Sequence, residues 1–228
     1  MDFVIAVHAK EHSERIPHKN VKVLGNQPLY AHALETATKV KGIMEGLGHS
    51  VTVVMDSDSP QFRAFAKHYF NAEVIERPPQ LATSKATGDH LAQWQVANYP
   101  NADVLVQLVP TSPFIKPETV VEGMMGFVNK EVKYSLIGIT VEQGYYWMNN
   151  KCNYLDEQGN IKNSQDIAPM IKETTGLYMV KTSYVKRFGR RSAFDKSNFV
   201  KLTPTEAIDI NNPGDWELAE LVWKGINT

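Results

Sequence analysis

The sequence of 228 residues has one cysteine, Cys152, and no long apolar run. A single cysteine excludes an intrachain disulfide and any zinc site that needs several thiolates. No apolar run approaches the 18 residues of a membrane-spanning helix, and the first residues, MDFVIAV, lack the length and the charge of a signal peptide. We therefore expect a protein of the reducing cytoplasm that binds no membrane.

An excess of charge of either sign is also missing, because 24 basic and 25 acidic residues give a formal net charge of −1. Without a basic field, no nucleic-acid partner is expected. Neither GxGxxG nor GxxxxGK[ST] occurs, which excludes the dinucleotide fingerprint and the Walker loop. The seven histidines form no HExxH motif, so no zinc site is expected.

What is present in the first half is a regular alternation of short apolar runs and amphipathic segments. This alternation predicts a mainly parallel sheet covered on both faces, with ligands beyond the carboxyl ends of the strands. With 43% hydrophobic residues, the chain can form one such α/β domain over 1–228. The predicted strands are 3–7, 50–55, 72–75 and 104–109, and the predicted helices are 29–40, 61–69, 88–98 and 120–129.

From about residue 133 the pattern changes to β segments that mix polar and aromatic residues. The segment 134–165 is predicted either to project from the domain as a β-rich dimerisation extension or to pack on its own domain as an ordinary hairpin. A strand at 206–211 and a helix at 215–224 are expected to complete the fold.

A cationic loop follows the first predicted strand and carries Lys10, Arg15 and Lys19. Open α/β folds bind phosphates at such a place, just before a helix. Cations there would neutralise a polyphosphate and the charge that builds on it during phosphoryl transfer. The alternative interpretation is a solvated surface loop.

Five sequence blocks, in the same order, resemble the acylneuraminate cytidylyltransferase family, which includes the CMP-sialic acid synthetases. The resemblance runs from Val4 to Glu220. The blocks are RIPHKN with the following LGNQPLY, ERPPQLATSKATGDHL, VLVQLVPTSPF, NSQDIAPMIKETTGLY and EAIDINNPGDWELAE. Each block alone is weakly specific, whereas five in order are fairly specific.

The resemblance implies a Rossmann-like, three-layer nucleotidyltransferase fold, a homodimer, and transfer of CMP from CTP to a small acidic sugar with release of pyrophosphate. It implies Mg²⁺ as cofactor, held by Asp209 and Asn211. Lys10, Arg15, Lys19 and Asp209 are the implied catalytic residues. Those implied for the nucleotide are Ala9, Lys10, Asn20, Arg77, Ala86 and Thr87, and those implied for the acceptor are Asn20, Gln107, Thr111, Ser112, Gln165, Glu173 and Tyr178.

Several positions depart from the family pattern. Lys10 replaces an Arg, which exchanges a bidentate fork for a point charge, and Glu14 replaces a Lys. Ser164 replaces the Arg that is expected to reach an acidic acceptor across a dimer, and Asn211 replaces the second metal aspartate. We therefore expect weaker metal binding and a divergent acceptor, which is an unusual 3-deoxy-ulosonic acid, a sugar phosphate or a phosphonate.

Other interpretations remain open from the sequence. Asp56 and Asp58 form a DxD pattern after a strand, as in metal-dependent glycosyltransferases, and a non-catalytic nucleotide-binding module would also tolerate the altered charges. Gln107 is read equally well as a buried core glutamine. Thr87 or Asp89 is the predicted N-cap of the helix at 88–98, and Asp215 that of the last helix.

Overall fold

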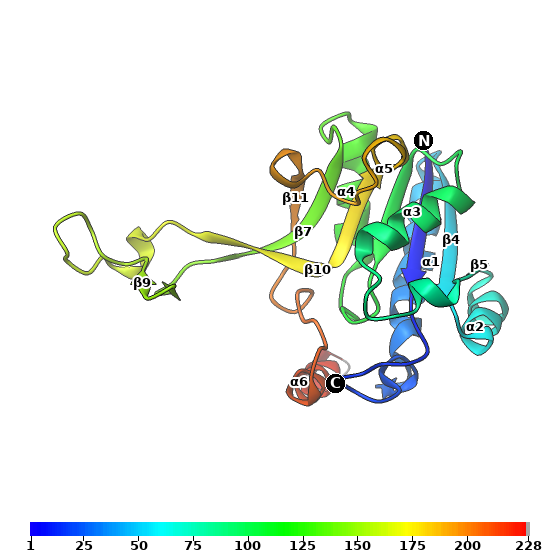
Figure 1. Cartoon of the computed structure of the whole chain (residues 1–228), viewed down its shortest axis with the longest axis horizontal. Coiled ribbons are helices and arrows are strands. Elements are labelled where there is room, and N and C mark those ends of the chain that lie inside the picture. The colour runs from blue at the N-terminus through cyan, green and yellow to red at the C-terminus, as the bar shows by residue number, and fades with distance from the viewer. Residues whose placement is uncertain (227–228) are drawn as a thin grey trace.

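A seven-stranded sheet forms the centre of the computed structural model, which describes residues 1–226 (Figure 1). The strand order is β11-β7-β10-β6-β1-β4-β5, and β10 alone runs antiparallel to its neighbours. This confirms the predicted α/β, Rossmann-like fold. The strands are β1 (Asp2–His8), β4 (Ser50–Ser57), β5 (Glu73–Glu76), β6 (Val104–Leu108), β7 (Ser135–Glu142), β10 (Met170–Lys181) and β11 (Asn198–Lys201).

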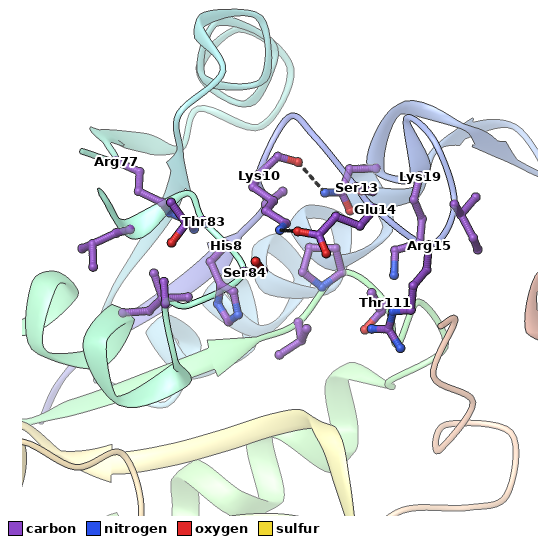
Figure 2. Close-up of a pocket in the computed structure, with 18 residues that line it drawn as sticks. His8, Lys10, Ser13, Glu14, Arg15, Lys19, Arg77, Thr83, Ser84 and Thr111 are labelled. Atoms are coloured by element: carbon purple, nitrogen blue, oxygen red, sulfur yellow. Dashed lines mark hydrogen bonds and ion pairs between the residues drawn. The ribbon is translucent and has the colours of Figure 1, made fainter. Parts of the chain in front are cut away.

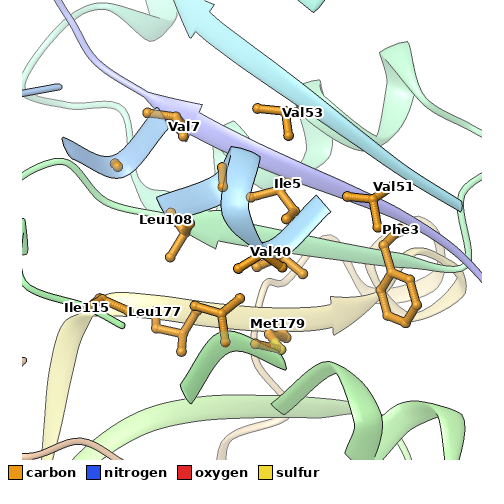
Figure 3. Close-up of a cluster of buried hydrophobic side chains, with 14 of the residues drawn as sticks. Phe3, Ile5, Val7, Val40, Val51, Val53, Leu108, Ile115, Leu177 and Met179 are labelled. Atoms are coloured by element: carbon orange, nitrogen blue, oxygen red, sulfur yellow. The ribbon is translucent and has the colours of Figure 1, made fainter. Parts of the chain in front are cut away.

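Helices cover both faces of this sheet because its central strands are apolar on both sides. On one face Ile5 and Val7 of β1 join the main core with side chains of α1, α2 and α4, as Figure 3 shows for Val40. On the other face Val4 and Ala6 pack with α3 and α5. The helices are α1 (Leu29–Gly46), α2 (Pro60–Phe70), α3 (Gly88–Asn98), α4 (Pro117–Val128), α5 (Thr182–Phe188) and α6 (Pro213–Ile226).

A long arm projects from the sheet between the end of β7 at Glu142 and the start of β10 at Met170 (Figure 1). The predicted extension at 134–165 therefore includes β7, which is a central strand here. The arm carries the short strands β8 (Trp147–Met148) and β9 (Lys151–Cys152) and the 3-10 turn η3 (Ser164–Asp166). Elsewhere the short elements are β2 (Val23–Leu24), β3 (Gln27–Pro28), η1 (Lys19–Val21), η2 (Pro79–Leu81) and η4 (Phe194–Lys196).

Of the two helix N-caps predicted from the sequence, one is confirmed and the other is wrong. Thr87 is the N-cap of α3, as predicted, because its hydroxyl accepts from the backbone of His90 while the His90 ring accepts from the backbone of Thr87. For α6 the predicted cap is wrong: the side chain of Asn212 accepts from the backbone of Asp215, and the Asp215 carboxylate accepts from the backbone of Asn212. Asp215 is thus the partner of the cap.

The predicted strand at 206–211 is also wrong, since this stretch forms turns and irregular chain. Ile210 is buried without a neighbouring strand and donates its backbone N–H to the carbonyl of Thr111, while Ala207 and Ile208 are half-buried. The carboxylate of Glu206 is buried and accepts from the backbone of Lys116 and the hydroxyls of Thr119 and Thr203. Among residues 1–226, no helix is long and apolar enough to cross a membrane.

Candidate active site

A cavity of about 350 Å³ opens at the carboxyl ends of β1 and β6 (Figure 2). The loop after β1, the loop between β5 and α3, and the turn after β6 form its walls. Eight of the lining residues are predicted site residues: Ala9, Lys10, Arg15, Lys19, Asn20, Arg77, Ala86 and Thr111. The fold therefore brings three separated sequence blocks to one place.

The three predicted cations of the first loop all line this cavity. Lys10 lies 3.8 Å from the carboxylate of Glu14, and its backbone carbonyl accepts from the side chain of Asn20 at 2.7 Å. Lys19 is buried, and its ammonium donates to the carbonyl of Ile210 at 2.6 Å. These contacts arrange an electropositive wall that suits a polyphosphate.

The charge of Lys19 is held in an environment that disfavours it. Burial lowers its pKa first, and the nearby charges of Arg15 and Lys10 act in the same direction, whereas Asp209 and Asp215 oppose them. A bound anion would relieve the excess positive charge of this group. The arrangement therefore favours an anionic ligand next to Lys19.

Arg77 lines the cavity but is held by a buried ion pair. Its Nε donates to Asp56 Oδ1 at 2.9 Å and its Nη2 donates to the Asp56 carbonyl at 2.8 Å. The other carboxylate oxygen accepts from Gln95 at 2.7 Å. The DxD interpretation is thereby contradicted, because Asp56 is fully buried and engaged, and Asp58 accepts from the backbone of Glu11.

Gln107, predicted to bind the acceptor, is a residue of β6 whose side chain joins the same buried network on the face that α3 covers, and it does not line the cavity. Its side chain is fully buried and donates to Gln95 at 2.8 Å. Val109, two residues further along, lines the cavity instead, and regular strand structure ends at Leu108. The alternative of a buried, satisfied core glutamine describes its burial, but its Oε1 has no hydrogen-bond partner among residues 1–226.

The remaining predicted acceptor residues are divided among several places. Thr111 lines the main cavity, whereas Ser112 is buried against Gly176, where a Cβ would come within 2.5 Å of its hydroxyl. Gln165 lies on the arm, where its carbonyl accepts from Gln143. Glu173 and Tyr178 meet Thr87 at a second, smaller cavity of about 190 Å³.

Asp209 and Asn211 lie together although no strand carries them. Asp209 Oδ2 accepts from the hydroxyl of Thr175 and from the side chain of Asn211, while its Oδ1 is buried without a partner in the described chain. Both residues line a third cavity, of about 710 Å³, which also contains Glu173. An unsatisfied buried carboxylate oxygen of this kind suits a hard cation.

Among the lining residues that the sequence analysis did not assign to the site are His8 and Arg191. His8 ends β1 in the main cavity, and its Nδ1 is buried without a partner among residues 1–226. Burial lowers the pKa of His8 to about 3, and the charges of Arg77 and Arg191 act in the same direction. Arg191 stands at the smaller cavity. The position of His8, between a predicted strand and the cationic loop, was the available signal for it, and nothing local marked Arg191.

The neutral His8 makes a testable contribution to stability. Because its pKa is low in the folded state and ordinary when unfolded, the unfolded chain binds more protons between about pH 3 and 6.5. The free energy of unfolding should fall on acidification through this window, by up to about 1.4 kcal/mol per pH unit for this one proton. We expect His8→Asn to lose that part of the acid dependence in denaturant titrations. His12→Asn, in the same loop but exposed, should retain it.

Comparison with known proteins places this chain in a family. The sequence profile described as cytidylyltransferase matches residues 4–217. A CMP-N,N'-diacetyllegionaminic acid synthase of Legionella pneumophila is 26% identical over 235 residues, which cover 96% of this chain and 95% of that protein. An N-acylneuraminate cytidylyltransferase of Escherichia coli is 26% identical over 137 residues, covering 60% of this chain and 31% of that protein.

Solved structures agree on the fold. A CMP:2-keto-3-deoxy-manno-octonic acid synthetase in complex with CTP superimposes with a TM-score of 0.68 and 16% identity, covering 99% of this chain and 100% of the other. A 4-diphosphocytidyl-2C-methyl-D-erythritol synthase from Anaerococcus prevotii gives 0.65 with 12% identity, covering 98% and 99%. With a family match over residues 4–217, this chain belongs to the cytidylyltransferase family and is a CTP-dependent nucleotidyltransferase.

Proposed function

We propose that this enzyme transfers CMP from CTP to a 3-deoxy-ulosonic acid related to sialic acid and releases pyrophosphate. The observation that carries the proposal is the convergence of Lys10, Arg15 and Lys19 on one cavity, which Ala86 in the loop before α3 also lines. The cations suit a triphosphate, and the loop before α3 offers backbone groups to a base. The acceptor class also follows the names of the relatives, which are synthases for acidic sugars.

In this reaction an acceptor oxygen attacks the α-phosphorus and the bond to pyrophosphate breaks. The protein has little covalent work to do, because catalysis consists of positioning and charge neutralisation. Lys10, Arg15 and Lys19 would hold the triphosphate and stabilise the departing pyrophosphate. Asn20, fixed by the carbonyl of Lys10, would help to orient the nucleotide.

Mg²⁺ is the cofactor we propose, held by Asp209 and Asn211. The partnerless Oδ1 of Asp209 fits such a cation, which prefers oxygen ligands and is commonly bound by one or two carboxylates plus substrate phosphates. Within residues 1–226 no three His, Cys, Asp or Glu side chains are grouped to hold a metal alone. The metal would supply charge neutralisation at the phosphates.

Asn211→Asp should lower the Mg²⁺ concentration needed for half-maximal activity. The proposed ligands, Asp209 and Asn211, include one carboxylate, and the substitution adds a second negative charge. We expect the Mg²⁺ concentration for half-maximal activity to fall about tenfold, which is the effect that substitutions next to bound metals commonly have on metal affinity. Mg²⁺ titrations of initial rate measure it. Asn101→Asp adds the same charge at an exposed site before β6 and is the control. An unchanged Mg²⁺ requirement in Asn211→Asp would remove Asn211 from the metal site.

We also propose that the enzyme is a cytoplasmic homodimer, since CTP is a cytoplasmic metabolite. The arm exposes large apolar side chains, with Trp147 67% and Met148 71% accessible, and Tyr145 and Ile161 nearby in sequence are also exposed. A second copy of this chain would cover them. Light scattering should give twice the chain mass, and a Trp147→Ser, Met148→Ser variant should shift it towards the monomer.

The test of the proposed function is pyrophosphate release with each of the four NTPs and Mg²⁺, against ulosonic acids, sugar phosphates and phosphonates. Release with CTP and an ulosonic acid alone supports the proposal. Release with a sugar phosphate or a phosphonate instead establishes the alternative acceptor, whose own anionic oxygen would be the nucleophile. Tight CTP binding without turnover on any acceptor would indicate a binding module.

A further inference from the structure

We propose that Arg191 binds the carboxylate of the acceptor and so selects a sugar acid over a sugar phosphate. This inference rests on the proposed function, because it concerns the second substrate of the same reaction. The residue lies on the chain that follows α5, far in sequence from the arm and from the cationic loop. Its place in the fold is the cavity of about 190 Å³ that Thr87, Glu173 and Tyr178 also line.

The guanidinium of Arg191 is fixed in position before any ligand arrives. It lies over the ring of Tyr178, with its central carbon 3.6 Å from the ring centroid. It also packs directly on Gly88, where an added Cβ would come within 2.2 Å of Nη1. The backbone N–H of Arg191 donates to Asp89 at 2.8 Å, which anchors the residue to the first turn of α3. A preorganised fork of this kind loses little entropy when it binds.

Its positive charge has no protein partner in the part of the chain that the structure describes. No carboxylate of residues 1–226 forms an ion pair with the guanidinium, and no hydrogen bond from it is found. Of the two acidic residues that line the same cavity, Glu173 accepts from the hydroxyl of Tyr178 and Asp89 accepts from the backbone of Arg191. The five N–H donors of the group are therefore available to a ligand.

The position of Arg191 suits the second substrate. The small cavity adjoins the nucleotide cavity through consecutive residues, Ala86 and Thr87. On its other side, Glu173 is shared with the cavity that contains Asp209, the proposed metal ligand. A group bound here lies between the nucleotide and the metal, where the reacting oxygen of the acceptor must come.

The surrounding charges favour a carboxylate over a phosphate. A carboxylate carries one negative charge and matches the planar fork of arginine in a bidentate pair. A phosphate monoester would bring nearly two charges next to Glu173, and like charges at such separations repel. With Ser164 on the arm in place of an arginine, Arg191 supplies the guanidinium from the body of the domain.

The test compares Arg191→Gln and Arg191→Lys with the wild-type enzyme, using 3-deoxy-manno-octulosonate, N-acetylneuraminate and N,N'-diacetyllegionaminate as acceptors. We expect Arg191→Gln to raise KM for the acceptor about 10- to 100-fold, the range for a lost hydrogen-bonded charge, with KM for CTP unchanged. Arg191→Lys should recover part of the loss. Arg190→Gln removes an adjacent, exposed arginine and is the control.

A second experiment replaces the acceptor carboxylate by a carboxamide. For the wild-type enzyme, KM should rise as much on changing the acid to the amide as it rises for the acid on changing Arg191 to Gln. For Arg191→Gln, changing the acid to the amide should raise KM little further. Two results would overturn the assignment. One is that Arg191→Gln raises KM for the acid and KM for the amide by the same factor. The other is that Arg191→Gln raises KM for CTP as much as KM for the acceptor. If the wild-type enzyme turns over no acceptor, the proposed function fails separately. Calorimetry with the same acids then decides: binding weakened by Arg191→Gln supports the carboxylate site, and equal or absent binding refutes it.

Discussion

Replacing Lys19 with alanine is expected to lower the rate of pyrophosphate release by about 100- to 1,000-fold, the cost of removing one preorganised donor from a developing charge. Lys19 is buried in the wall of the main cavity, and one of its donors is committed to the carbonyl of Ile210 at 2.6 Å. Its ammonium has further N–H donors for phosphate oxygens. The low polarity that depresses its pKa also strengthens its attraction for an anion.

Lys19 has a second role, which the experiment must separate from the first. Its bond to Ile210 holds the chain next to Asp209, so a loss of activity could come from a displaced metal ligand. Mg²⁺ titrations of Lys19→Ala distinguish the two, because a displaced ligand raises the Mg²⁺ requirement and a lost phosphate contact does not. Lys22→Ala removes a neighbouring cation that lies over the ring of Trp216 and should leave turnover near normal. Near-normal turnover by Lys19→Ala would refute its catalytic assignment.

The sequence predicted the layers of this fold because periodicity is a local property. Apolar runs such as that of β1 and β4 mark buried strands, and the helix over α3 was predicted with the same ends that the structure gives it. The stretch at 206–211 misled the same reasoning. Its alternating pattern is that of a strand, but its buried residues pack on a turn and a helix, so no ladder forms.

The site could be predicted only where one segment supplies the chemistry. The cationic loop was predicted from one short segment, whereas the positions of Gln107 and Arg191 depend on partners in other elements of the fold. Gln107 of β6 donates to Gln95 of α3, and Arg191, on the chain after α5, lies over the ring of Tyr178 of β10. No spacing rule within a single segment specifies such pairs, which result from packing.

Removing the carboxylate of Asp56 is expected to produce the largest loss of stability, about 3 to 5 kcal/mol in the free energy of unfolding. Asp56→Ala would leave the buried guanidinium of Arg77 without its counter-charge and Gln95 without its acceptor. An unpaired buried charge is far more costly than the loss of a surface ion pair. Chemical denaturation at neutral pH measures the change, and Asp58→Ala, just beyond the end of the strand that carries Asp56, is the matched control.

The same variants separate this structural role from the metal role that a DxD motif would give to Asp56. The double variant Asp56→Ala, Arg77→Met removes both charges, so it should be more stable than Asp56→Ala alone. If Asp56 were a metal ligand, Asp56→Asn would keep its stability and lose its Mg²⁺-dependent activity. The buried network predicts the opposite result for Asp56→Asn: the free energy of unfolding falls, and the molecules that remain folded keep their activity. The reason is that Asp56 contacts Arg77 and Gln95, whereas the cations proposed to bind phosphate lie on another loop.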